Sequence, residues 1–375
     1  SIWSLEFDTY ITRVKTHNPG TITNPFLDNS AWTDITRANA SIIFKNKYEN
    51  AEGSAHIYFN NGVHDIYDGF HSNDNLFGVT IREGFSISDN TILIIGSELK
   101  RFSGKARNAF PLIDTTVTET AGFLVINQKL LNNLNFSGGV RINNHSVYGI
   151  EFAPQINLQY NLNKNLSVYT SIAKGFRSPT LNELFLFGAN LNLKPERLWN
   201  YEAGIKQRLF DNRLRINLNS FLIEGEDFIV MTGMFPNNQN QNIKNISNRG
   251  LELETSYYAT PQLSFSANYS FLKMGSKIIG APEHQAFAEV YYQLNKFLFN
   301  INLRTISNLY TVASASLEKK QSFTLLNATV WYKVYKNITA FVKTDNLLDR
   351  SYEVIDGYPM PGRSFNIGIM LDGVL

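Results

Sequence analysis

Histidine and tyrosine side chains occur close together early in the chain, where they could bind a metal ion or a metal complex. The stretch from His64 to His71 also contains Asp65 and Tyr67. Neutral imidazole beside a carboxylate or a phenolate is a reasonable set of metal ligands. The spacing is not that of a tight structural zinc site. We therefore expect His64, Tyr67 and His71 to contact a metal complex from a loop; the alternative is that these side chains are only solvated.

Three residues elsewhere belong to the same candidate ligand-binding set. His17 begins the turn-like run His17-Asn18-Pro19-Gly20, and Met231 and Met234 lie in a later polar segment. Thioether sulfur is a soft ligand that suits a copper-like ion. The alternative for both methionines is placement by chance, and these residue types do not identify the metal.

The sequence lacks the common catalytic motifs. It contains no Gly-x-Ser-x-Gly, no phosphate-binding glycine loop, no His-Glu-x-x-His and no cysteine nucleophile. We therefore expect neither an enzymatic activity nor a resident cofactor.

The composition is that of a folded chain without membrane-spanning helices. Of the 375 residues only 18% are charged, whereas as many as 13% are aromatic. A low charged fraction and a high aromatic fraction both argue against disorder. A net charge of +2 leaves no excess of Lys and Arg for phosphates, so nucleic acid is not an expected partner. No apolar stretch approaches the roughly 20 residues that a spanning helix requires. The absence of cysteine excludes disulfides and is compatible with an oxidising compartment such as a bacterial envelope.

Alternation of apolar and polar residues with period two recurs along the chain. Residues 215–221, 264–270 and 298–304 each place aliphatic or aromatic side chains on one face and mainly Asn, Ser or Arg on the other. This period is typical of strands with two different faces. The chain is therefore predicted to be all-β, as a soluble sandwich or as a membrane barrel.

The spacing of turns favours a transmembrane antiparallel up-and-down barrel over a sandwich. Short polar turns are expected near residues 48–53, 88–90, 130–134, 162–165, 210–213, 259–262, 294–296 and 334–337. Longer, looser segments lie near 16–35, 63–74, 103–115, 175–197, 231–245, 274–284, 309–321 and 347–362. Alternating short and long connections are typical of outer-membrane barrels, whose strands cross a ~25 Å apolar band. Counting the strands on either side of these connections gives about 18, which lies within the even-numbered range of bacterial outer-membrane barrels.

Aromatic pairs near the predicted short turns agree with this interpretation. Tyr257-Tyr258, Tyr291-Tyr292 and Trp331-Tyr332 lie where an apolar band would meet water. The alternative is the general preference of aromatic residues for strands. The polar face implies a wet interior wide enough for a channel or a plug.

Three segments carry motifs in an order that one protein family shows. The first runs from residue 175 to 204, the second is 246–254, and the third combines 344–352 with 357–365. Together they resemble TonB-dependent outer-membrane receptors, strongly from about residue 117 to the end. The matching residues to which we assign a mainly structural role are Phe176, Arg177, Pro179, Asn192, Pro195, Glu196, Asn346, Leu347, Asp349, Tyr352, Gly362 and Arg363.

The first motif has a simple physical content. Pro179 and Pro195 fix φ and remove hydrogen-bond donors where the chain leaves the sheet. Arg177 and Glu196 are expected to join the loop to the wall as a charge-assisted pair.

The resemblance implies a protein of the Gram-negative outer membrane that imports a scarce nutrient such as a metal complex, siderophore, cobalamin or haem. It implies contact with outer-membrane lipid, a small-molecule or metal-complex ligand, and the TonB energising complex as a partner. It leaves open a surface lipoprotein or other outer-membrane subunits as further partners. Histidine is absent between residues 178 and 195, which makes haem less expected.

Complete family members have an N-terminal TonB box, a plug and a 22-stranded barrel. We expect residues 1–375 to form one outer-membrane β-barrel domain, with the plug, the box and the first four strands outside this sequence. Two other functions stay open: a plugless structural or accessory barrel subunit without transport activity, and an open pore for passive diffusion.

Overall fold

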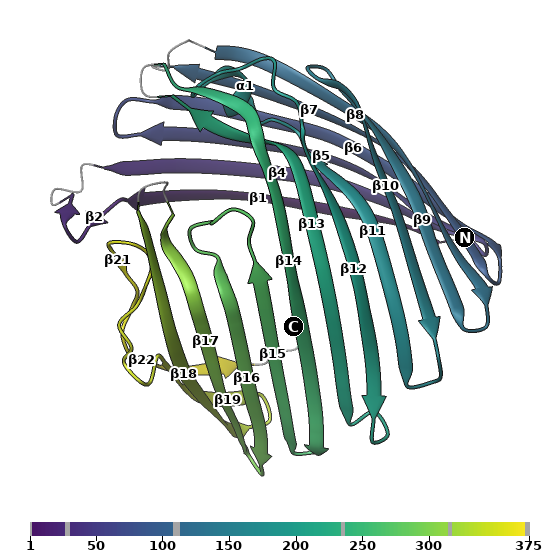
Figure 1. The fold of residues 1–375 in the computed structure, drawn as a ribbon, viewed down its shortest axis with the longest axis vertical. Helices are drawn as coiled ribbons and strands as arrows, with labels where there is room; N and C mark the ends of the chain where they lie inside the picture. The colour runs from purple at the N-terminus through teal and green to yellow at the C-terminus, as the bar shows by residue number, and fades with distance from the viewer. Residues whose placement is uncertain (1, 27–30, 108–112, 234–236, 314–316, 372–375) are drawn as a thin grey trace. The chain divides into compact units, whose positions relative to one another are not determined.

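The strands account for most of the computed structural model, which describes residues 2–26, 31–107, 113–233, 237–313 and 317–371 (Figure 1). The long strands are β1 Ile2–His17, β4 Trp32–Lys47, β5 Ala51–Ile66, β6 His71–Ser88, β7 Thr91–Arg107, β8 Ile113–Leu131, β9 Leu134–His145, β10 Gly149–Asn161, β11 Leu166–Arg177, β12 Glu196–Leu209, β13 Leu214–Thr232, β14 Gln239–Thr260, β15 Leu263–Lys273, β16 Pro282–Leu294, β17 Phe297–Ala313, β18 Glu318–Tyr335, β19 Ile338–Asp345 and β22 Ser364–Leu371. They form one sheet of 18 strands, as the sequence predicted.

Shorter elements lie in the connections. They are β2 Gly20–Thr21, β3 Asn24–Pro25, β20 Glu353–Ile355, β21 Tyr358–Pro359 and the helix α1 Leu181–Phe185. β2 pairs with β3, and β20 pairs with β21, as two small hairpins. No helix in the described ranges is long and apolar enough to cross a membrane.

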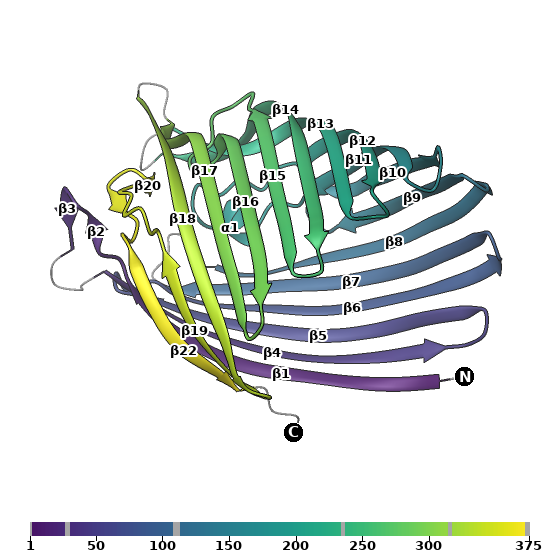
Figure 2. The same ribbon diagram turned by 90° about the horizontal axis from the view of Figure 1, so that it is seen from below.

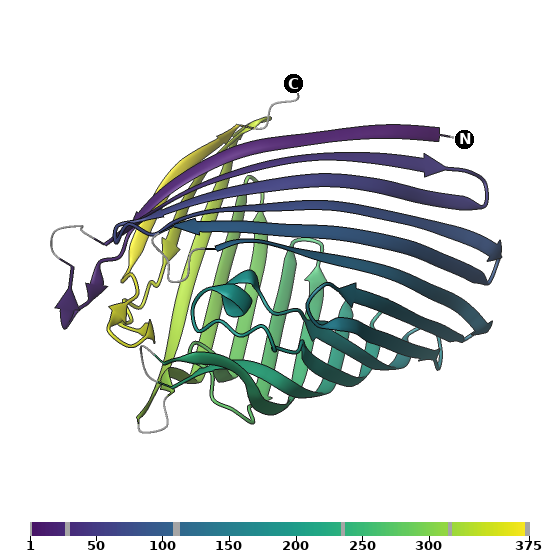
Figure 3. The ribbon, with the colours of Figure 1, turned by 90° about the horizontal axis from the view of Figure 1, so that it is seen from above.

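Sequence neighbours in the sheet pair as antiparallel hairpins. β1 and β4, for example, pair without interruption from Ile2 opposite Lys47 to His17 opposite Trp32. The chain divides into two compact units. Unit 1 contains residues 1–159, 171–201 and 224–246, and unit 2 contains residues 160–170, 202–223 and 247–375. β4–β8 run side by side in unit 1 (Figure 3), as do β15–β18 in unit 2 (Figure 2).

The connections alternate between two ends of the strands. At one end the connections are tight, with two residues between β6 and β7 and four between β10 and β11. At the other end they include the long segments 178–195 and 346–363. We call these the inner and the outer end, following the asymmetry of membrane barrels.

One outer connection departs from the prediction, because β9 and β10 are joined by only three residues, 146–148, where no turn was expected. Gly149 has a φ of +87°, a value that glycine adopts without a Cβ clash. The predicted loop at 63–74 is also shorter, since strand pairing continues to the four residues 67–70.

Several strands carry apolar and polar side chains on opposite faces. In β22 the alternate residues Ile367, Ile369 and Leu371 are 82%, 69% and 73% exposed. Asn39 and Asn60, by contrast, join their side chains across β4 and β5 at 2.7 Å. A chain that leaves large aliphatic side chains exposed and pairs its polar ones has the pattern of a sheet that faces lipid on one side.

Candidate functional site

The outer connection 178–195, which we call the crossing loop, begins with a helix that its own sequence specifies. Thr180 is the N-cap of α1, and its side chain accepts a hydrogen bond from the Glu183 backbone N–H at 3.2 Å. Glu183 in turn accepts from the Thr180 backbone N–H at 2.7 Å. This reciprocal capping box satisfies donors that a helix N-terminus leaves free. The helix therefore starts at a fixed point just after Pro179.

Arg177 joins the start of this loop to its end. Its Nε and Nη2 donate to Glu196 at 2.6 and 2.7 Å, which is the pair that the sequence predicted. Its Nη1 and Nη2 also donate to Glu183 at 2.9 and 3.0 Å. Glu196, at 9% exposure, accepts a further bond from the Ile229 backbone N–H at 2.9 Å. One guanidinium thus fixes both ends of the crossing loop in fork geometry.

The pKa of Glu183 reflects these contacts. Burial disfavours the charged carboxylate, but the hydrogen bonds from Arg177 and from the Thr180 backbone outweigh burial, and the pKa lies below its ordinary value. Glu183 is therefore ionised whenever the loop is ordered at neutral pH.

Asparagines on β14 hold the far side of the loop. Asn240 Nδ2 donates to the Phe187 carbonyl at 2.7 Å, and its backbone N–H donates to the Gly188 carbonyl at 2.8 Å. Asn242 accepts from the Lys194 N–H and donates to the Lys194 carbonyl, each at 2.9 Å. These side chains take the place of a strand partner for a loop that has none.

Apolar side chains anchor the crossing loop on the sheet of unit 1. Leu184 and Leu193 are 1% and 2% exposed. Leu181 lies over Gly104 of β7, where its Cδ1 would be 3.3 Å from an added Cβ. Phe187 contacts Phe70, in the connection between β5 and β6, with ring centroids 5.9 Å apart. The loop is thus a packed element.

A polar row lies on the same face of the sheet as Gly104. Asp74 of β6 is directly opposite Gly104 of β7 and Gly62 of β5, and Gly62 is opposite Arg37 of β4. Arg37 donates to Asp74 at 3.0 Å and contacts His64 Nε2 at 3.0 Å. A Cβ on Gly62 would be 2.6 Å from Asp74 and 2.8 Å from Arg37, so only glycine leaves room for this pair. We call Arg37, His64 and Asp74 the polar triad.

The polar triad remains accessible to solvent. The side chains of Arg37 and Asp74 are 47% and 38% exposed, and that of His64 is 25% exposed. The triad therefore offers hydrogen-bond donors and acceptors, including a fixed cation, one strand away from the residue on which the crossing loop rests.

A second charged cluster lies at the outer ends of β10, β12 and β13. Arg197 Nε donates to both oxygens of Glu151 at 3.0 Å, and its Nη1 donates to Asp227 at 2.7 Å. Lys174 lies 3.5 Å from Glu151. Two cations and two carboxylates balance here, which is why a carboxylate at 6% exposure, Glu151, is tolerated.

The short hairpin 146–148 also touches the crossing loop. The Tyr148 hydroxyl and Ser178 Oγ are 2.7 Å apart, and the Tyr148 ring stacks on His145 with centroids 4.1 Å apart. Burial raises the pKa of Tyr148 above its ordinary value. Tyr148 is therefore a neutral hydrogen-bonding group.

The two histidines predicted to act together lie on opposite faces of the β5–β6 ribbon. His64 is opposite Ser72, on the polar face, whereas His71 is opposite Asp65, on the face that carries Phe59. His71 Nδ1 and Asp65 Oδ1 are 2.7 Å apart. The structure therefore does not bring His64 and His71 together, because alternation in a strand separates side chains of opposite parity.

The other predicted ligand residues are dispersed. His17 is exposed at the end of β1, opposite Trp32. Tyr67 is 51% exposed in the connection between β5 and β6. Met231 on β13 is 48% exposed, and its sulfur accepts from Asn238 Nδ2 at 2.9 Å. Met234 lies outside the described residues. Within the described ranges no group of three or more His, Asp or Glu side chains is placed to hold a metal ion.

The remaining motif residues organise the last outer connection, in unit 2. Asn346, at 4% exposure, donates to the carbonyls of Arg350 and Pro361 and accepts from the Arg350 N–H. Asp349 accepts from the Arg363 N–H at 2.9 Å, and a Cβ on Gly362 would lie 3.0 Å from Asp349. Leu347 donates its N–H to the Leu326 carbonyl, and the Tyr352 ring contacts the Phe323 ring at a tilt of 37° with centroids 4.4 Å apart.

The remaining residues of the first motif lie in the crossing loop or beside it. Asn192 accepts no long-range bond in the described structure, but its N–H donates to Asn190 Oδ1 at 2.9 Å. Pro195 is fully buried, and Phe176 is partly buried near the end of β11.

Several residues of the site were not foreseen. Glu183, Asn240, Asn242 and Arg197 have partners up to 57 residues away, which spacing alone does not reveal. The run of amides at 237–242 was the available signal, since many amides in one outer connection need partners.

Known proteins resemble this chain over most of its length. The model of the TonB dependent receptor-like β-barrel family matches residues 3–347. The vitamin B12 transporter BtuB of Photobacterium profundum is 25% identical over 248 residues, which cover 63% of this chain and 40% of that protein. The chain thus spans less than half the length of this curated relative.

Solved receptors share the fold. The ferric enterobactin receptor PfeA of Pseudomonas aeruginosa superposes with a TM-score of 0.85 at 15% identity, covering 98% of this chain and 67% of that one. The siderophore receptor PirA of the same species gives 0.77 at 16% identity, covering 91% and 64%. With the family match over residues 3–347, the conclusion is that this chain belongs to the TonB-dependent receptor family.

Proposed function

We propose that this chain is the barrel part of an active importer that takes up a chelated metal complex, such as a ferric siderophore or a cobalamin, across the outer membrane of a Gram-negative bacterium. Transport, not catalysis, is the function that we assign. The partners are outer-membrane lipid, the ligand, and the TonB complex, which would act through a plug not in this sequence.

One observation carries the proposal. The crossing loop is packed on the polar face of the sheet and rests on Gly104, directly beside the accessible polar triad. A fixed loop next to exposed donors and acceptors is the arrangement expected of a preorganised binding surface. Such a surface loses little conformational entropy when a ligand binds.

The polar triad suits the periphery of a chelate better than a bare metal ion. Arg37 Nη2 and Asp74 Oδ1 lie 3.0 and 3.1 Å from His64 Nε2, so this nitrogen already has polar partners. A metal ligand needs a free lone pair on the imidazole nitrogen. Arg37 and Asp74 can instead bind the carboxylate, phenolate or amide groups of an organic ligand.

The names of the relatives support the same class of nutrient. BtuB is named as a vitamin B12 transporter, PfeA as a ferric enterobactin receptor and PirA as a siderophore receptor. Cobalamins and ferric siderophores both enclose their metal within an organic ligand. They share the hydrogen-bonding edges that the polar triad could bind.

Equilibrium binding tests the proposal. Outer membranes that contain the natural protein are titrated with cyanocobalamin, ferric enterobactin and ferric hydroxamate complexes. We expect one probe to bind, and Arg37→Gln to weaken it by about tenfold, the loss of one charge-assisted contact. Arg82→Gln is the matched control, since Arg82 is exposed on the same face of β6 at its inner half. Failure of every chelate to bind, or equal weakening by both variants, would contradict the proposal.

A further inference from the structure

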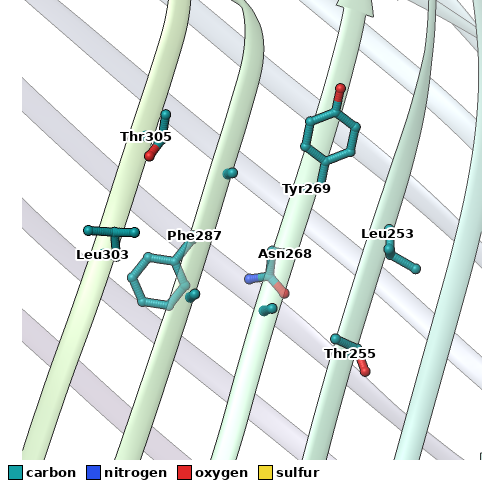
Figure 4. A pocket seen from close by; sticks show the side chains of 10 residues that line it. Leu253, Thr255, Asn268, Tyr269, Phe287, Leu303 and Thr305 are labelled. Atoms are coloured by element: carbon teal, nitrogen blue, oxygen red, sulfur yellow. The ribbon is translucent and has the colours of Figure 1, made fainter. Parts of the chain in front are cut away.

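An apolar groove lies on the exposed apolar face of unit 2, within the stretch that would cross the membrane. It is formed by β14 to β17, and Figure 4 shows Leu253, Tyr269, Leu303 and Thr305 around it. The groove has a volume of about 250 Å³ and continues into a second one of about 300 Å³. The residues shared by the two are Thr255, Ala267, Ala288 and Leu303.

The strand register shows why the surface is hollow here. Thr255 is opposite Ala267, Ala267 is opposite Ala288, and Ala288 is opposite Leu303. Small side chains thus form a row across three strands, β14 to β16, which ends at Leu303 of β17 and lies between larger neighbours such as Phe265. A depression of this kind in a lipid-facing surface fits an extended hydrocarbon chain.

Two cations lie above the groove on the same face. Arg249 of β14 is directly opposite Lys273 of β15, and both are exposed. They share the face of Leu253 and Tyr269, because these residues are four positions away along each strand. Like charges directly opposite each other repel, at a Cβ separation of about 5 Å. In the described structure neither cation has a carboxylate within ion-pair distance, so an anion between them would remove the repulsion.

Along the strands, Arg249 and Lys273 lie where the outer surface of the membrane is expected. Arg249 lies 11 residues from Thr260 at the inner end of β14, and Lys273 lies 10 residues from Leu263 at the inner end of β15. Strands of about 9–11 residues span the apolar layer. Tyr257 and Tyr292, which are 38% and 40% exposed, mark the inner boundary on the same face.

Polar groups continue the site between the cations and the groove. The Tyr269 hydroxyl and His284 Nδ1 are 2.8 Å apart. His284 of β16 is opposite Phe271, which lies between Tyr269 and Lys273 along β15. An anionic head group at Arg249 and Lys273 would thus have hydrogen-bonding neighbours on the side that faces the groove, where its acyl chain would lie.

We propose that Arg249 and Lys273 bind the phosphate of a phosphorylated glycolipid of the outer leaflet, with one acyl chain lying in the groove lined by Ala267 and Ala288. The inference rests on the outer-membrane location in the proposed function. A phosphate monoester carries close to two negative charges and several acceptor oxygens, which match two adjacent cations. The outer leaflet of Gram-negative outer membranes is rich in such glycolipids, and this fits the height of the pair.

Co-purification of lipid tests this assignment. The natural protein and its variants are extracted from outer membranes in mild detergent, and bound lipids are counted per chain by native mass spectrometry. We expect the natural protein to retain about one phosphorylated glycolipid, and Arg249→Gln with Lys273→Gln to lower its occupancy about tenfold, as for loss of ~1.4 kcal/mol. Ala288→Phe, which fills the groove, should lower it as well.

Matched controls separate this site from general surface charge and from folding. Lys296→Gln with Lys336→Gln removes two charges from the inner turns 295–296 and 336–337. Ala328→Phe adds the same bulk on the same face, opposite Ile301 and outside the groove lining. Both controls should retain the glycolipid. Equal retention in the Arg249 and Lys273 variant, or equal loss in the controls, would overturn the inference, as would retention of phosphatidylglycerol in place of the glycolipid.

Binding of cyanocobalamin and ferric chelates, measured on the same preparations, separates this inference from the proposed function. The Arg249 and Lys273 variant should bind chelates as the natural protein does. If no chelate binds but the glycolipid is lost only from the site variants, the proposed transport function fails and the glycolipid site stands.

Discussion

The side chain of Asn242 and the backbone of Lys194 exchange two hydrogen bonds, each of 2.9 Å. A primary amide can donate and accept in one plane, as a backbone peptide group does. Asn242 thereby gives a loop residue the pairing that a neighbouring strand would provide. The crossing loop is held in place by such substitutes for strand pairing, and its order depends on a few side chains.

Asn242→Ala is expected to loosen the crossing loop without unfolding the sheet. It leaves the Lys194 N–H and carbonyl without their partner, at a cost of about 1–3 kcal/mol for the loop. Hydrogen exchange measured by mass spectrometry should show faster exchange for residues 184–194 and unchanged exchange in β5 and β6. Gln241→Ala is the control, since among the described residues the Gln241 side-chain amide makes one hydrogen bond, an exposed contact of 3.4 Å with Gln239. Unchanged exchange in the loop would show that Asn242 does not hold it.

Arg177→Lys is expected to destabilise the same loop although it keeps the charge. Lysine cannot form the fork that reaches Glu196 and Glu183 together. A double-mutant cycle of Arg177→Lys with Glu196→Gln should give a coupling free energy of roughly 2 kcal/mol in loop-opening equilibria measured by exchange. Additive effects of the two substitutions would mean that the observed pair contributes no coupling.

His64 and His71 should behave differently when each is replaced with Ala. His64 is part of the polar triad beside the crossing loop, whereas His71 lies on the opposite face of the ribbon. We expect His64→Ala to weaken chelate binding about fivefold, by releasing Arg37 from one of its partners. We expect His71→Ala to leave binding within about twofold. The opposite order, measured by titration of outer membranes, would mean that the ligand binds on the face of His71 and not on the face of the polar triad.

Acidification should loosen the two outer loops through Glu183 and Asp349. Their ordinary pKa values are 4.5 and 3.8, and the contacts described above lower the pKa of Glu183, while the Arg363 backbone N–H lowers the pKa of Asp349. A carboxyl group with a lowered folded-state pKa stabilises the fold above its ordinary pKa, and this contribution is lost as the pH falls through the folded-state value.

Exchange of residues 178–195 and 346–363, corrected for intrinsic rates, should therefore be flat from pH 7 to about pH 5 and rise below pH 4.5 and 3.8. Glu183→Gln should remove the pH dependence of the first loop only. A rise that begins near neutral pH would point to groups other than these carboxylates.

The sequence predicted the sheet well because alternation and turn composition are local signals. The inner turns at 162–165 and 210–213 occur at the predicted residues. The hairpin at 146–148 was missed because its signal is confined to Gly149 and the preceding polar residues. Local patterns identify strands, whereas a connection of three residues is too short to have a recognisable composition.

The site was predicted less completely, because its contacts depend on register. Arg177 and Glu196 were paired correctly from a motif in which they flank one loop. The separation of His64 from His71 depends on the four-residue turn at 67–70, which sets the register of β5 against β6. The partnership of Glu183 with Asn240, 57 residues away, depends on how the loop packs and not on spacing.

Energised uptake measures the proposed transport itself. Cells in which the natural protein is the only receptor are supplied with labelled cyanocobalamin or labelled ferric enterobactin, with and without a functional TonB complex. We expect accumulation of one of these chelates that requires TonB, with surface binding unchanged when TonB is lost. Accumulation that is equal with and without TonB would contradict it and would favour passive diffusion, and no accumulation of any chelate would favour a structural barrel.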